Sequence, residues 1–189
     1  MKYRKMAGEK ISVLGFGCMR FPTTSKNAED ITAVKSAKML EYAIEKGVNY
    51  FDTAYVYHGG KSESFIGGVL KPYRDKIHIA TKCPTWEVKC EEDFDRLLNE
   101  QLERLQTDYI DFYLMHALDK DRFKNVVEKF NLIDKLNKAK ADGKIRHIGF
   151  SFHDDVETFK KIIDANPNWE FCQIQLNYIN VKYQAGLEG

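Results

Sequence analysis

Four residues that could share one proton-transfer reaction lie at or just beyond the ends of three short apolar runs. Asp52 lies near the end of the first run, and Tyr57 follows it in a loop. Lys82 follows the second run and His116 the third. Ligands bind at the carboxyl ends of strands in parallel α/β proteins, so these positions predict one reactive site.

The four side chains together have the chemistry of a general acid. A free phenol has a pKa of about 10, and a nearby ammonium stabilises the phenolate and lowers that pKa. A carboxylate keeps the ammonium charged, and a histidine can hydrogen-bond the substrate oxygen or share the proton. Such a donor suits a carbonyl oxygen that gains charge as hydride reaches its carbon. The hydride must come from a cofactor, because no side chain supplies one.

Taken singly, each of these residue types is more often a surface or packing residue. The prediction therefore depends on the elements that position them, which alternate between strand and helix. We expect a small hairpin in Met1–Lys10 and strands at Ile11–Gly17, Val48–Asp52, Ile77–Thr81, Ile110–Met115, Ile145–Ser151 and Phe171–Asn177. Helices are expected from a cap at Asp30 to Lys46, from Ser62 to Pro72, at Glu91–Leu105, at Arg122–Ala141, and after a cap at Asp154. This alternation predicts an α/β fold with parallel strands and outer helices.

Length and composition fit one compact domain over residues 1–189. The chain is 43% hydrophobic with a formal net charge of +1, which gives no reason to expect a nucleic-acid or anionic-membrane partner. No run is long enough to span a bilayer, and the N-terminus does not resemble a secretory signal. The four cysteines form no C-x-x-C pair, so we expect neither a metal or iron–sulfur site nor a disulfide framework. The expected location is the cytoplasm.

The motifs around these residues resemble the aldo-keto reductases over essentially the whole chain. The matching segments are Gly15–Arg20, Asn49–Tyr57, Ala80–Lys82, Asp108–His116, Gly143–Ser151 and Gln173. The resemblance implies an eight-stranded (β/α)8 TIM barrel and NADPH, less often NADH. It also implies that Tyr57 is the general acid, that Lys82 and Asp52 tune it, and that His116 orients the carbonyl.

The resemblance further implies a cofactor site. Ser151 and Gln173 match positions that hold the nicotinamide carboxamide, and Met19 and Arg20 match a first-strand loop that touches the cofactor. Asp52 is expected near the cofactor as well.

The chain departs from the family pattern in two ways, of which the first is the residue after Ser151. The family often has Ser-Asn where this chain has Ser151-Phe152, which leaves one carboxamide contact missing or supplied by His153. The run Gly149–Asp154 resembles a branch whose longer members carry a C-terminal ferredoxin-like iron–sulfur extension, which we do not expect here.

The second departure is length, because only about six of the eight βα units are present. In the family the last two units grip the adenosine 2′-phosphate and close the barrel. Six strands alone would leave long edges prone to aggregation. We expect either a truncated product or a barrel completed by a second chain or an exchanged segment.

The sequence predicts NAD(P)H-dependent reduction of an aldehyde or ketone, with a small carbonyl compound as substrate. The alternative is a truncated or degenerate family member that binds nucleotide or a partner chain without turnover. A metal-dependent hydrolase on the same kind of fold is disfavoured, because the five histidines show no ligand-pair spacing on a shared helix.

Overall fold

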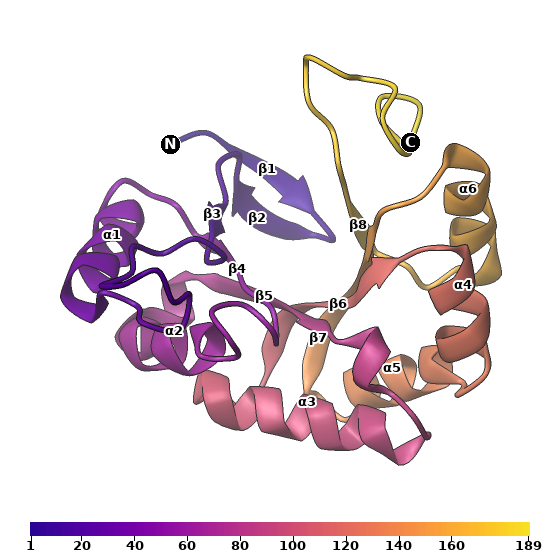
Figure 1. The fold of residues 1–189 in the computed structure, drawn as a ribbon, viewed down its shortest axis with the longest axis horizontal. Helices are drawn as coiled ribbons and strands as arrows, with labels where there is room; N and C mark the ends of the chain where they lie inside the picture. The colour runs from indigo at the N-terminus through magenta and orange to yellow at the C-terminus, as the bar shows by residue number, and fades with distance from the viewer. The chain divides into compact units, whose positions relative to one another are not determined.

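The computed structural model describes residues 1–189 (Figure 1). Contacts within it divide the chain into two compact units. Unit 1 comprises Met1–Thr81 and Leu98–Phe112, and unit 2 comprises Lys82–Leu97 and Tyr113–Gly189. The divisions fall inside two strands and one helix, so these elements pass from one unit into the other. The single domain expected over residues 1–189 stays a prediction.

Strands and helices alternate along the chain. A six-stranded sheet has the order β3-β4-β5-β6-β7-β8, which follows the sequence. Its strands are β3 (Phe16–Gly17), β4 (Tyr50–Asp52), β5 (His78–Cys83), β6 (Ile110–Leu118), β7 (Ile145–Phe152) and β8 (Phe171–Ile174). β4 pairs in parallel with β3 and β5, and β7 pairs in parallel with β8. A helix joins each strand to the next, which confirms the predicted α/β class.

Unit 1 begins with the predicted hairpin, formed by β1 (Tyr3–Met6) and β2 (Glu9–Ser12). The predicted strand Ile11–Gly17 is wrong. Its first two residues belong to β2, and the Ser12 hydroxyl donates to the Leu14 carbonyl at 2.8 Å, which turns the chain. Only Phe16 and Gly17 then enter the parallel sheet.

Two helices of unit 1 lie side by side, α1 (Ala33–Glu45) and α2 (Ser62–Leu70) (Figure 1). Asp30 does not cap α1, because its carboxylate accepts the Ser25 hydroxyl and the helix starts after Thr32. Past Leu70 the chain continues as a 3-10 helix, η1 (Lys71–Lys76), which contains Pro72.

Helix α3 (Glu92–Leu105) runs through both units, and unit 2 holds the remaining helices. The 3-10 helix η2 (Thr85–Glu87) follows β5. The single helix predicted at Arg122–Ala141 is wrong. The structure has α4 (Lys120–Arg122), which continues directly into the π-helix η3 (Phe123–Glu128), and then α5 (Leu132–Ala141). Asn131, in a left-handed conformation (φ 51°), lies between η3 and α5.

The last elements of unit 2 differ from prediction at their ends. Helix α6 (Val156–Ala165) is capped by Asp155, which accepts from the Thr158 amide at 2.8 Å, whereas Asp154 accepts from the Lys120 amide. Strand β8 stops three residues before Asn177, whose side chain accepts backbone amides in a turn. None of the helices has the length and apolar character needed to cross a bilayer.

Candidate active site

Asp52 lies at the carboxyl end of β4, in register with Gly17 on β3 and Ala80 on β5. Its carbonyl accepts from the Cys18 amide at 2.7 Å, and the next amide, of Thr53, donates to the Ala80 carbonyl at 2.8 Å. Both neighbouring strands therefore fix the backbone of Asp52, a half-buried residue, at the end of its strand, where the sequence predicts it.

Tyr57 lies outside the sheet, in a tight turn between β4 and α2. Its amide donates to the Ala54 carbonyl, and its own carbonyl accepts from the amides of Gly60 and Ser62, each at 3.1 Å. The three residues that follow it, beginning with His58 (φ 56°), all have positive φ. The turn reverses the chain sharply, so Tyr57 is placed by local contacts and not by strand pairing.

Arg104, on α3 within unit 1, braces this turn from the side. Its guanidinium lies 4.2 Å from the ring centroid of Tyr55 and 3.5 Å from the Tyr55 carbonyl oxygen. It also pairs with Glu100 one helical turn away and with Glu63 at 3.3 Å. Because Tyr55 precedes Tyr57 by two residues, Arg104 ties the turn to a helix far away in sequence.

Glu63 is the buried partner of Arg104. It is fully buried on α2, and its Oε1 accepts from Thr81 and from Gln101, each at 2.6 Å. Burial raises the pKa of Glu63, although these hydrogen bonds and Arg104 act in the opposite direction. The sequence gives little signal for this network, because the side chains that contact Glu63 lie 18 to 41 residues away from it in the chain.

Met19 and Arg20 follow β3 in unit 1, and both are exposed. Cys18 before them is fully buried, and its carbonyl accepts from the Ser62 hydroxyl at 3.1 Å. The Met19–Arg20 segment is therefore a short exposed loop of unit 1 whose first end is fixed to the start of α2.

Lys82 and His116 belong to unit 2. Lys82 lies in β5 and is 2% exposed. His116 lies in β6, half-buried, with its ring centroid 5.0 Å from that of Trp86. Burial, assisted by the positive charges of Lys82, His153 and Arg122, lowers the pKa of His116 to about 3. Its imidazole is therefore neutral near pH 7, a state that the sequence alone does not indicate.

Ser151 and Gln173 face one another in register on β7 and β8. Ser151 is buried, and its Oγ accepts from the Ala117 amide at 2.7 Å, directly after His116. Gln173 is exposed. The structure therefore brings this predicted pair together, next to the strand that carries the histidine.

The departure at Phe152 has a structural reason. Its side chain is 1% exposed and packs at 5.2 Å between ring centroids against Phe159 of α6. The imidazole of His153 lies 3.2 Å from the Gln184 carboxamide in the C-terminal segment. Ser151 is the register partner of Gln173, and a carboxamide contact from His153 stays a prediction.

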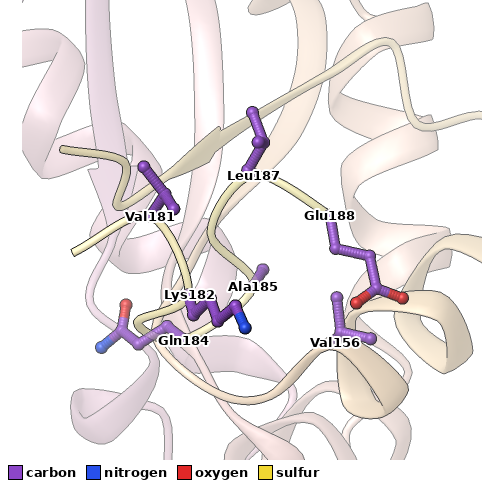
Figure 2. A pocket seen from close by; sticks show the side chains of 7 residues that line it. All are labelled: Val156, Val181, Lys182, Gln184, Ala185, Leu187 and Glu188. Carbon is purple, nitrogen blue, oxygen red and sulfur yellow. The ribbon is translucent and has the colours of Figure 1, made fainter. Parts of the chain in front are cut away.

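A cavity of about 500 Å³ lies elsewhere in unit 2, where the C-terminal segment folds back on the start of α6 (Figure 2). The lining residues are Val156, Val181, Lys182, Gln184, Ala185, Leu187 and Glu188. None of the predicted site residues lines this cavity. The structure gathers no group of three or more His, Cys, Asp or Glu side chains that could hold a metal ion.

Comparison with known proteins relates this arrangement to others. The model of the aldo/keto reductase family matches residues 13–187. A probable aldo-keto reductase of Glycine max is 33% identical over 153 residues, covering 76% of this chain and 42% of that protein. An L-galactose dehydrogenase of Arabidopsis thaliana is 32% identical over 167 residues, covering 85% of this chain and 50% of that protein. The chain thus spans about half the length of these relatives.

Solved structures agree with the sequence relatives. A holo aldo-keto reductase of Bacillus halodurans superposes with a TM-score of 0.74 at 28% identity, covering 93% of this chain and 57% of its own. An aldo/keto reductase of Klebsiella pneumoniae, solved with NADP and acetate, gives 0.70 at 25% identity, covering 89% and 55%. The fold is of the (β/α)8-barrel type, with six of its strands in this chain. With its motifs, its strand order and nearly its whole length matched, the chain belongs to the aldo/keto reductase family.

Proposed function

We propose that this chain catalyses the NAD(P)H-dependent reduction of an aldehyde or ketone to an alcohol, with Tyr57 as the general acid. The observation that carries the proposal is the family match over residues 13–187, which includes every candidate residue. Of the two relatives only one has a name that specifies a substrate, L-galactose, so the proposal stops at the carbonyl class. Because the chain spans about half of each relative, the relatives' activity is only a proposal for this chain.

The residues at the β7–β8 pair fit a nicotinamide carboxamide. A carboxamide offers one acceptor oxygen and two N–H donors. Ser151 Oγ accepts from a backbone amide, so its hydroxyl hydrogen can be donated, and the exposed Gln173 amide can both donate and accept. Met19, Arg20 and Asp52 would contact the cofactor from unit 1. NADPH, or alternatively NADH, would supply the hydride when bound.

In this proposal the protein's own groups handle the proton. Tyr57 donates its phenolic proton to the carbonyl oxygen as negative charge develops there. The buried Lys82 ammonium would stabilise the phenolate that remains, and Asp52 would hold the ammonium in place. Because its pKa is low, His116 is uncharged at pH 7. As a neutral imidazole it would donate an N–H to the same oxygen and orient the carbonyl.

A second candidate function is nucleotide binding without turnover. It is favoured by one observation: the chain spans 42% and 50% of the relatives above, so the half that they have in addition is unmatched here. A second chain or an exchanged segment that completes the fold belongs to the same proposal.

A fluorescence titration with NADPH, followed by NADPH oxidation with an aldehyde panel, separates the two candidates. The purified chain should be used at a known oligomeric state. Saturable binding with aldehyde-dependent oxidation supports the reductase. Binding without oxidation supports the second candidate, and no binding by the folded chain argues against both.

A further inference from the structure

His58, the residue directly after Tyr57, joins two loops of unit 1. His58 is buried, with 6% of its surface exposed. Nε2 lies 3.0 Å from the backbone nitrogen of Phe21, and Nδ1 lies 2.5 Å from the backbone oxygen of Ala28. Both partners belong to the connection between β3 and α1, which also carries Met19 and Arg20. The imidazole thus links the Tyr57 turn to the candidate cofactor loop.

The two contacts fix the tautomer of His58. A backbone N–H only donates, so Nε2 must be the unprotonated acceptor for Phe21. A carbonyl oxygen only accepts, so Nδ1 must carry the hydrogen that reaches Ala28. The ring is therefore neutral in this arrangement, with both nitrogens in use.

Packing and backbone conformation hold the imidazole in this place. The Phe21 ring lies 5.6 Å from the His58 ring and 5.2 Å, edge to face, from Phe65 on α2. His58 itself has φ 56°, a left-handed conformation that a histidine adopts rarely and keeps only where its surroundings fix it.

The Met19–Arg20 loop is fixed at both ends to the segment that carries Tyr57. At its first end, the amide of Cys18 donates to the Asp52 carbonyl at 2.7 Å, and the carbonyl of Cys18 accepts from Ser62. At its other end, Phe21 follows Arg20 directly and donates to His58. Without His58 only the first end would be tied to the β4–α2 segment by these bonds.

We propose that His58 is a positioning residue that sets the cofactor loop at Met19–Arg20 against the Tyr57 turn. The inference rests on the proposed function, because the loop matters only if a nucleotide binds there. His58 does not touch the reacting atoms in this proposal. It acts through the Phe21 amide on one side and through its peptide bond to Tyr57 on the other.

Three substitutions separate the two hydrogen bonds. His58→Gln places an amide oxygen near the position of Nε2, so it can still accept from Phe21. His58→Asn places an N–H near the position of Nδ1, so it can still donate to Ala28 but not accept from Phe21. His58→Leu loses both. Ala43→Gly, in the buried face of α1, is the matched control for loss of stability alone.

The first readout needs no cofactor. Amide hydrogen exchange at Phe21, followed by NMR, should be slow in the parent chain and in His58→Gln, and faster by about tenfold or more in His58→Leu, because an unsatisfied buried donor favours opening to water. Equal protection of Phe21 in the parent and in His58→Leu would overturn the link.

The second readout is the NADPH dissociation constant from fluorescence titration. We expect His58→Leu and His58→Asn to bind about tenfold more weakly, and His58→Gln to stay within about threefold of the parent. Ala43→Gly should lower the melting temperature without changing this constant. Unchanged binding in all three His58 variants, or losses that follow the melting temperatures with Gln no better than Leu, would overturn the positioning role. A parent chain that binds no NADPH would overturn the proposed function, and this inference with it.

Discussion

Tyr57 and His116 are held in place by different means. His116 lies in β6, a nine-residue strand whose first six residues are buried, so its backbone position follows from the sheet. Tyr57 lies in a turn with a run of positive φ values, supported by side chains that come from α3 and by the His58 contacts. A strand-borne group thus depends on backbone pairing, whereas the loop-borne group depends on particular side chains around its turn.

Lys82→Met should give the largest effect, because it removes a strand-borne charge from the proposed reaction itself. Met keeps the length and the buried apolar stem, so the fold should survive. We expect kcat to fall by about 10² or more, the low end of what a positioned proton donor contributes. Steady-state NADPH oxidation at saturating aldehyde measures it.

The matched control for this variant is Lys89→Met, at an exposed lysine of the same unit. A Lys82→Met enzyme with the kcat of the parent would show that the buried ammonium has no part in the proton transfer.

Arg104→Lys should give the next largest effect, because it weakens the support of the loop-borne tyrosine. Lysine keeps the charge near Glu63 but loses the planar group that packs on Tyr55. We expect kcat to fall by about tenfold, since small misplacements of a catalytic group are costly, with little change in the NADPH dissociation constant. Stopped-flow single-turnover rates test this.

Thr85→Val is the corresponding change beside the strand-borne His116. Its hydroxyl donates to the His116 carbonyl at 3.0 Å, so the substitution removes one direct neighbour of the histidine. Because the sheet still holds β6, we expect kcat to stay within about threefold of the parent. A larger loss in Thr85→Val than in Arg104→Lys would reverse the comparison.

The pH dependence of stability should show that His116 is buried as a neutral group. Its pKa is lowered to about 3 in the folded chain, below the unfolded value of about 6.5. As the pH falls through this window, the unfolded chain binds a proton that the folded chain does not. Stability is therefore lost as the pH falls, by at most about 1.4 kcal/mol per pH unit from this group.

Urea unfolding of the parent and of His116→Gln between pH 7 and 4 isolates this contribution, because all other groups are shared. The parent should lose stability more steeply than the variant. Parallel curves would mean that His116 titrates alike in the folded and unfolded chain.

The strand-borne part of the site could be predicted from the sequence, and the loop supports could not. Apolar runs that end at Asp52 and directly before Lys82 and His116 follow the local period of a strand. The structure places Asp52 in β4, and it extends β5 and β6 to include Lys82 and His116. The contacts of Arg104 with Glu63 and Tyr55 join residues 41 and 49 positions apart, and nothing in the local pattern encodes them.

The errors in the fold prediction have the same origin. The strand predicted at Ile11–Gly17 fails at a turn made by the Ser12 side chain, and the helix predicted at Arg122–Ala141 fails at the left-handed Asn131. In both places the apolar pattern continues across a break made by one residue. Hydrophobic periodicity therefore finds the elements but not their interruptions.

The most direct test of the proposed reductase is the rate of the chemical step in Tyr57→Phe. Single-turnover reduction of an aldehyde should be measured with NADPH bound, at matched occupancy, beside Tyr42→Phe as an exposed control on α1. We predict that Tyr57→Phe binds NADPH as the parent does and reduces the aldehyde slower by about 10² or more. A Tyr57→Phe chain that reduces aldehydes as fast as the parent would contradict the role of Tyr57 as general acid.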